Sequence, residues 1–122
     1  MKIVRMSEAP KVPLGSLVTS MFTGPDVTRQ ALLPESKEFD LSIVSFGKGI
    51  RNKFHAHDGE QVLIVTAGEG IVATEYEEVF VTTGDVILIS AGEKHWHGAT
   101  KNSEFSHIYL TKTGAKFTKL ED

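Results

Sequence analysis

Short strand-like segments separated by turns are the feature that most restricts how this sequence can fold. From residue 41 onward, runs rich in Val, Ile, Phe, Tyr and Thr end at glycine-containing turns such as Gly47-Lys48-Gly49 and Gly84-Asp85. The runs are 41–46, 51–57, 61–66, 71–74, 79–82, 86–89, 95–99 and 105–111, and we expect a turn at residues 67–70. A turn about every 8 to 12 residues, with no long helical pattern between turns, indicates an all-β sandwich or barrel. A βαβ fold would need crossover helices, for which this spacing leaves no room.

The sequence predicts one domain with an extended N-terminal arm. Its 122 residues suit a single domain, and 40% apolar with 24% charged residues suit a globular one. All four prolines lie in the first 40 residues, where their fixed φ and missing N–H favour arm, edge strand and loop. We therefore expect residues 1–40 to form the N-terminal arm and edge strands, with an edge-strand candidate at 1–5, and residues 41–122 to form the barrel core. An immunoglobulin-like sandwich competes, but it lacks the usual Cys and Trp marks and leaves the histidines unexplained.

Charge and cysteine content exclude several classes of function. The sequence has thirteen Lys and Arg and sixteen Asp and Glu, which gives a net charge of −3, and it contains no basic block. The charge distribution therefore gives no indication of a nucleic-acid or anionic-membrane partner. Cysteine is absent, which excludes disulfides and thiolate metal sites. The first residues lack the apolar run of a secretory signal, and no stretch approaches the roughly 18 apolar residues of a membrane span. We expect a soluble, cytoplasmic protein that acts on a small molecule.

The five histidines carry most of the chemical information. His55 and His57 form one i, i+2 pair, His95 and His97 form another, and His107 lies on a late strand. Residues two apart on a strand point to the same face, so each pair can project into a barrel. Neutral imidazole is a good ligand for Fe, Zn, Cu and Ni, and Mn is admissible with an added oxygen ligand. The alternative, that some are hydrogen-bonded or surface histidines, is weaker for two pairs than for one lone residue.

The spacing around both pairs matches the two sequence motifs of cupins. The first match runs Gly49, five residues, His55-Ala56-His57, three residues, Gln61, six residues, Gly68. The second runs Gly84, five residues, Ser90-Ala91-Gly92, two residues, His95, three residues, Ala99. Gln61 replaces the motif's glutamate, Ser90 its proline and Ala99 its asparagine. The chain therefore resembles the cupins, which implies a jelly-roll barrel, also described as a double-stranded β-helix.

Within the cupins, the chain resembles the small metal-dependent group that includes the bacterial cupin hydroxynitrile lyases. The string Gly92-Glu93-Lys94-His95-Trp96-His97-Gly98-Ala99 is its most specific segment, and that group also has glutamine at the fourth ligand position. The resemblance implies His55, His57, Gln61 and His95 as ligands of one divalent ion, with Mn or Fe favoured and Zn or Ni possible. It implies His107 as an acid/base residue and His97 beside the pocket. Gln61 could instead hydrogen-bond a ligand, and His107 could be a satisfied core histidine.

The residues also allow an independent argument about chemistry. A histidine near a divalent ion has its protonated form disfavoured, so His97 and His107 should be neutral near pH 7 and ready to accept a proton. If the resemblance holds, Ser42, Val44 and Thr111 line the pocket, and Arg51 could face a substrate anion. We expect core positions for the aromatic residues Phe46, Phe54, Phe80 and Phe105.

We expect an enzyme that performs C–C lyase or isomerase chemistry at a substrate oxygen held by the ion. Cleavage of a cyanohydrin belongs to this class and could be a side activity. Two alternatives stay open: an Fe(II) dioxygenase, and a non-catalytic cupin that binds a metal or a small ligand. We expect a homodimer because open barrel edges need cover, and the first 20 residues could supply an exchanged strand.

Overall fold

The computed structural model describes residues 1–15 and 19–122, and these residues form ten strands. The first half of the chain contains β1 (Val12–Pro13), β2 (Val27–Ala31), β3 (Phe39–Phe46), β4 (His55–His57) and β5 (Gln61–Thr74). The second half contains β6 (Glu78–Thr82), β7 (Val86–Ile89), β8 (His95–Ala99), β9 (Phe105–Lys112) and β10 (Phe117–Lys119). Two short 3-10 helices, η1 (Met6–Glu8) and η2 (Thr19–Met21), precede β2. In the part of the chain that the structure describes, no helix has the length and apolar character that a membrane crossing requires.

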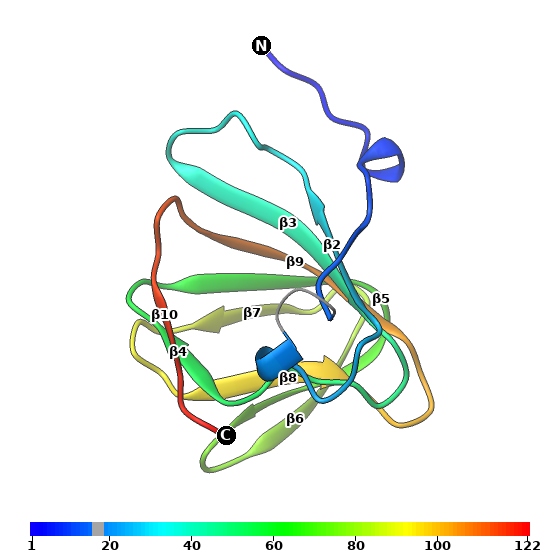
Figure 1. Ribbon diagram of the computed structural model, residues 1–122, viewed down its shortest axis with the longest axis vertical. Coiled ribbons are helices and arrows are strands. Elements are labelled where there is room, and N and C mark those ends of the chain that lie inside the picture. Colours follow the sequence, from blue (N-terminus) through cyan, green and yellow to red (C-terminus); the bar gives the residue numbers. More distant parts are fainter. Residues whose placement is uncertain (16–18) are drawn as a thin grey trace.

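Strand β5 joins two sheets that curl around one interior (Figure 1). Its first part pairs with β7 and β9, and the first sheet continues from β9 through β3 and β2 to β1. Its last part pairs with β6 and β8, and the second sheet continues from β8 through β4 to β10. All these pairings are antiparallel, so the expectation of an all-β barrel in a single domain is confirmed.

The predicted turn at residues 67–70 is wrong, because this stretch lies inside β5. The register of β5 against β9 shifts between Val65 and Ala67, which is a β-bulge, and Gly68 has a positive φ of 74°. A Cβ atom at Gly68 would collide with the carbonyl oxygen of Glu104, and one at Gly70 with the ring of Phe105. The glycines therefore permit a bend and a close approach of β9 rather than a chain reversal.

The hydrophobic core lies between the two sheets, beside the histidines. Phe46, Leu63, Val65 and Phe105 are at most 2% exposed and belong to one apolar cluster. The expected core position of Phe80 is wrong, since this residue is 76% exposed. It lies on β6, which pairs with β5, and the alternation of the strand turns Val81 inward instead.

The N-terminal segment is attached to the edge of the first sheet. Strand β1 pairs with β2, and the side-chain amide nitrogen Nε2 of Gln30 donates hydrogen bonds to the carbonyl oxygens of Met6 and Ala9 at 3.3 and 2.9 Å. Residues 1–5 form no strand, in contrast to the edge-strand candidate, and Figure 1 shows them leaving the barrel. The segment before β2 is thus an arm with one anchored region.

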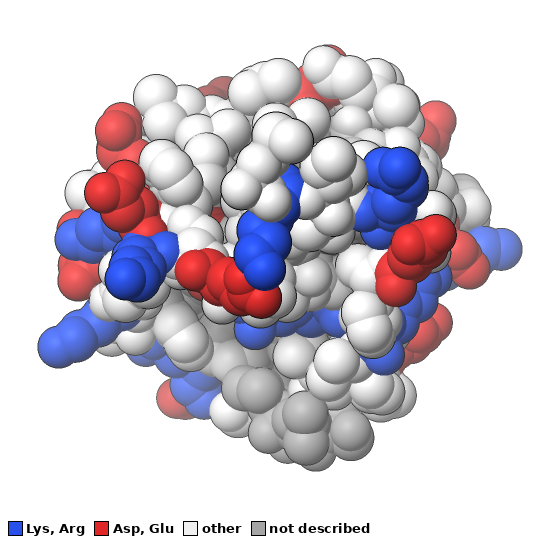
Figure 2. Space-filling view, turned by 90° about the horizontal axis from the view of Figure 1, so that it is seen from above, with Lys and Arg blue, Asp and Glu red and all other residues white. Residues whose placement is uncertain are grey.

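Charged side chains of both signs are interspersed on the face seen in Figure 2. Among the described residues of this face, Lys and Arg alternate with Asp and Glu, and neither sign forms an extended patch. This face therefore offers no concentrated positive charge to a polyanion.

Candidate functional site

All five histidines meet in the interior of the barrel. His55 on β4 pairs directly with His95 on β8, and their ring centroids lie 4.3 Å apart. The ring of His57 lies 5.0 Å from that of His55 and 5.5 Å from that of His95. Gln61, the first residue of β5, is buried. The four predicted ligands thus come from three strands, and the i, i+2 spacing turns both members of each histidine pair to the same side.

Backbone carbonyl groups orient two of these rings. Nδ1 of His55 donates to the carbonyl oxygen of Lys53 at 2.6 Å, and Nδ1 of His95 donates to that of Glu93 at 2.8 Å. A carbonyl oxygen only accepts, so Nδ1 carries the proton in both neutral rings and Nε2 carries a lone pair. Hydrogen bonds of this kind fix the tautomer and orientation of histidines that bind metals.

Three buried atoms at this place have no hydrogen-bond partner among the described residues. They are Nε2 of His57, Oε1 of Gln61 and Nε2 of His95. Buried polar atoms are nearly always paired, so unpaired atoms on three of the four predicted ligands need an explanation. A bound cation would satisfy all of them.

A slightly different set of histidines also has ring nitrogens close enough together to hold an ion. One ring nitrogen from each of His55, His95 and His97 lies within 4.8 Å of the other two, and this group could hold a metal ion. It shares His55 and His95 with the predicted ligands, but it contains His97 in place of His57 and Gln61.

Both ring nitrogens of His97 are already engaged in hydrogen bonds. Its Nε2 lies 3.2 Å from Nδ2 of Asn52, and its Nδ1 lies 3.0 Å from Nε2 of His107. His107 pairs with Val44 on β3 and Val65 on β5, and its own Nδ1 is buried without a partner among the described residues. His97 and His107 therefore form a connected pair beside the other three rings.

Burial lowers the pKa of every histidine in the cluster. The pKa of His55 falls to about 3, mainly through desolvation and then through the charge of His95. Desolvation lowers the pKa of His107 to about 4, that of His97 well below its usual value, and those of His57 and His95 as well. All five rings are neutral at pH 7, the form in which imidazole binds metal ions.

A cavity of about 350 Å³ opens beside the cluster. Val44 and Thr111 line it, as the resemblance implied. Ser42 is fully buried and accepts a hydrogen bond from Nε of Arg29 at 3.1 Å. The lining combines apolar side chains with histidines and other polar groups; it comprises Leu14, Met21, Phe22, Arg29, Asp40, Val44, Phe46, Asn52, His55, His57, Gln61, His97, His107, Tyr109, Thr111, Ala115 and Phe117. A cavity of this kind suits a small, partly apolar organic molecule.

Sequence reasoning missed a polar group in the cavity wall. Asp40 accepts hydrogen bonds from Nη2 of Arg29 at 3.2 Å and from the hydroxyl of Tyr109 at 3.1 Å. Strand alternation could have indicated Tyr109, because it lies two residues after His107. Arg29 and Asp40 had no such signal, since their contact joins two different strands.

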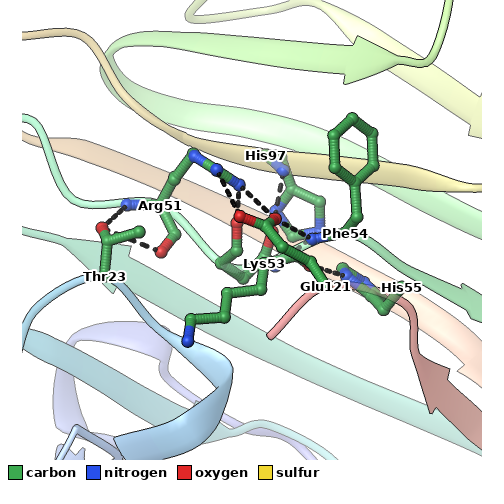
Figure 3. Close-up of polar contacts among 8 residues, drawn as sticks. Thr23, Arg51, Lys53, Phe54, His55, His97 and Glu121 are labelled. Carbon is green, nitrogen blue, oxygen red and sulfur yellow. Dashed lines mark hydrogen bonds and ion pairs between the residues drawn. The ribbon is translucent and has the colours of Figure 1, made fainter.

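Arg51 lies outside the cavity lining of the described residues. Its guanidinium group lies over the ring of Trp96, 4.6 Å from the centroid, and forms two hydrogen bonds of 3.1 and 3.0 Å with the carboxylate of Glu121. Glu121 also accepts the N–H of Phe54 at 2.9 Å (Figure 3). Arg51 and Glu121 therefore brace the chain immediately before the ligand strand β4.

Comparison with known proteins identifies the family. The family model of the cupin domain matches residues 42–110. The chain is a cupin. The match includes every histidine of this cupin, so the family and the site are defined by the same stretch of sequence.

A curated relative and two solved structures illustrate what this cupin is similar to. It is 44% identical over 70 residues to (R)-mandelonitrile lyase of Granulicella tundricola, covering 55% of this chain and 52% of that protein. The match thus spans about half of the lyase. A cupin-like protein of Thermotoga maritima superposes with a TM-score of 0.77 at 30% identity over 84% of this chain and 80% of the other. The polyketide cyclase RemF of Streptomyces resistomycificus shares the fold alone, with a TM-score of 0.78 at 15% identity over 100% and 88% of the two chains.

Proposed function

We propose that this cupin is a metal-dependent lyase that cleaves a C–C bond beside the hydroxyl group of a small organic substrate, as in a cyanohydrin. The observation that carries this proposal is that His57, Gln61 and His95 each have a buried polar atom without a hydrogen-bond partner among the described residues, beside a partly apolar cavity. The similarity of part of the chain to (R)-mandelonitrile lyase supports the choice of reaction.

The ligands of the ion would be His55, His57, Gln61 and His95. Their donor set of three neutral imidazoles and one amide oxygen suits Mn or Fe, and also admits Zn or Ni. His97 is excluded from this set because both of its nitrogens are engaged by Asn52 and His107. When bound, the ion supplies Lewis acidity toward a substrate oxygen, and an uncharged Gln61 leaves its positive charge undiminished.

The protein's own residues would bind the substrate and move its proton. Phe22, Val44 and Phe46 offer an apolar wall for the carbon skeleton, which keeps water away from the reacting atoms. Cleavage breaks the bond to the nitrile carbon, whose electron pair leaves as cyanide, while the hydroxyl oxygen becomes the carbonyl oxygen. The hydroxyl loses one proton and cyanide gains one. His107 and His97, joined by a 3.0 Å hydrogen bond, can hold and pass that proton.

The decisive experiment is an assay of protein purified without a histidine tag, after elemental analysis. We expect about one divalent ion per chain and cleavage of mandelonitrile with and without oxygen. His57→Ala should lose the ion, and His107→Ala should keep it but lower kcat by about 100-fold or more. Lys37→Ala, at an exposed position on another part of the barrel, is the control and should match the wild type.

Three results would contradict the proposal: no retained or reconstituted metal, oxygen consumption coupled to turnover, or full activity of His107→Ala. Oxygen consumption would favour the dioxygenase alternative. Binding of a small ligand without turnover would favour the non-catalytic one. The cytoplasmic location stays a prediction.

A further inference from the structure

Asn52 bridges the backbone and the ring of the same histidine. Its Oδ1 accepts the backbone N–H of His97 at 2.8 Å, and its Nδ2 lies 3.2 Å from Nε2 of that residue. Asn52 is buried and lines the cavity just before the ligand strand β4. The backbone carbonyl of His97 in turn accepts the N–H of Asn52 at 3.0 Å, so the two residues are held together by three contacts.

The backbone contact determines the direction of the side-chain contact. A backbone N–H can only donate, so the side-chain atom of Asn52 that faces it must be the oxygen. The amide nitrogen must then face the ring, and it also can only donate. Nε2 of His97 is therefore the acceptor and carries no proton. The ring holds its single proton on Nδ1.

The same reasoning extends to the next ring. The protonated Nδ1 of His97 lies 3.0 Å from Nε2 of His107 and donates to it. Nε2 of His107 is thus unprotonated, and this ring also holds its proton on Nδ1. That Nδ1 is buried and has no partner among the described residues. A buried N–H without an acceptor is unfavourable, so an acceptor atom of a ligand placed next to it would be favoured.

We propose that Asn52 is a positioning residue that sets the tautomers of His97 and His107, so that His107 meets the substrate as a hydrogen-bond donor through Nδ1. The first partner of His107 is then an acceptor atom, either the substrate oxygen or the nitrile nitrogen. This refines the expectation from the sequence that His107 is ready to accept a proton. The role in turnover rests on the proposed function, whereas the tautomers do not.

The tautomers can be read directly by nitrogen NMR of the full chain labelled with ¹⁵N-histidine, recorded without metal and with Zn(II). Protonated and unprotonated ring nitrogens have well-separated shifts, and single His→Gln variants assign the two rings. We expect both His97 and His107 to be protonated at Nδ1 and unprotonated at Nε2. A wild-type spectrum with a protonated Nε2 on His97 overturns the proposal by itself.

Replacement of Asn52 by aspartate reverses the hydrogen-bond direction without changing the shape of the side chain. A carboxylate only accepts, so Asn52→Asp should move the proton of His97 to Nε2 and that of His107 to Nε2. The chain's other asparagine, Asn102, is exposed, and Asn102→Asp provides the same chemical change as a matched control. If Asn52→Asp folds and leaves the tautomers unchanged, Asn52 does not set them and the proposal fails.

Kinetics then separate this role from a general loss of structure. Asn52→Asp should lower kcat by about 100-fold with a much smaller change in KM, while metal content and Asn102→Asp activity stay at the wild-type level. An equal fall in folded fraction and metal content would mark Asn52 as merely structural and contradict the role in turnover. If the tautomers are as expected but no cyanohydrin is cleaved by any form, the proposed function fails and the tautomer assignment stands.

Discussion

Hydrogen bonds distinguish two kinds of imidazole ring in the histidine cluster. His55 and His95 each use one nitrogen on a backbone carbonyl and keep the other free, which suits a ligand. His97 uses both nitrogens, and its link to His107 suits the movement of a proton. The distances between ring nitrogens alone make His97 a candidate ligand. Its hydrogen bonds argue against that role, because both of its ring nitrogens already have partners.

The buried state of His107 makes stability depend on pH. Its pKa is about 4 in the folded chain and 6.5 when exposed. Between these values the unfolded state binds more protons, so the free energy of unfolding falls as pH drops from 6.5 toward 4. In metal-free protein, this one group should remove about 1 kcal/mol between pH 7.5 and pH 5.5.

Urea unfolding of the wild type and His107→Asn at both pH values, with a chelator present, measures this contribution. The variant lacks the group, so its loss between the two pH values should be smaller by that amount. An identical loss in both proteins would contradict the expectation, whatever their absolute stabilities.

Sequence spacing was enough to predict that the histidine pairs share a face, because both members of each pair lie on one short strand. The i, i+2 pattern needs only the alternation of a single strand, and the motif intervals identify both pairs. Asn52 had no comparable signal, since its partner His97 lies 45 residues further along the chain. The role of Asn52 depends on the contact between the segment before β4 and strand β8, and no local sequence pattern predicts that contact.

Among the strands, β4 combines an important role with little support of its own. It has three residues, of which two are proposed ligands. Toward β8 it forms one registered pair, His55 with His95, whereas toward β10 it forms three, from Phe117 opposite His57 to Lys119 opposite His55. The chain just before β4 is held by Arg51 and Glu121. Pairing with β10 and the ion pair between Arg51 and Glu121 therefore stabilise the position of β4.

Loss of the Glu121 carboxylate should weaken metal binding. Glu121→Ala removes the acceptor for the N–H of Phe54, next to His55, and leaves Arg51 without its partner. We expect the dissociation constant for Mn(II) or Zn(II), measured by competition with a chelator, to rise by about 10-fold.

The matched control is Glu77→Ala, which removes an exposed carboxylate from the turn between β5 and β6. It should bind metal like the wild type. Equal affinities for all three proteins would show that β4 keeps its position without the ion pair.

The sequence predicted most strands to within a few residues, because β-branched runs and glycine turns act locally. It failed at residues 67–70, where glycine serves the close approach of Phe105 from another strand. It also did not predict β10, whose three residues are all exposed and polar or aromatic. Such a strand forms because β4 has an open edge, which is a property of the assembled sheet.

On the scale of the whole molecule, the outer face of the first sheet is aliphatic across four strands. Two cross-strand rows share this face: Leu41, Leu110, Val62 and Leu88 form one, and Ile43, Ile108, Ile64 and Val86 form the other. Val86 and Leu88, on the edge strand β7, are 66% and 61% exposed. A contiguous apolar face of this kind is typical of an interface between proteins.

We predict that this face joins two copies of the chain, in agreement with the homodimer expected from the sequence. An ordinary interface takes about 800 Å² from each partner, and the two apolar rows extend across four neighbouring strands. Light scattering at micromolar concentration should give the mass of a dimer. Leu88→Asp should give a monomer, because it would bury an unpaired charge in the interface.

Phe80→Asp is the matched control, since Phe80 is also apolar and exposed but lies on β6, outside the two rows. It should remain dimeric. A monomeric wild type, or dissociation by Phe80→Asp alone, would show that the two rows are not the interface.

The continuity of β5 bears on how this cupin could be recombined with its relatives. One end of this strand carries Gln61, and the other end pairs with the strand of His95 and His97. A chimera that exchanged one sheet for that of another protein would have to cut β5. The cut would separate the end of β5 that carries Gln61 from the end that pairs with β8. Crossover points in the exposed turn at residues 75–77 leave β5 intact. Chimera libraries built there should contain more folded proteins than libraries with crossover points inside β5.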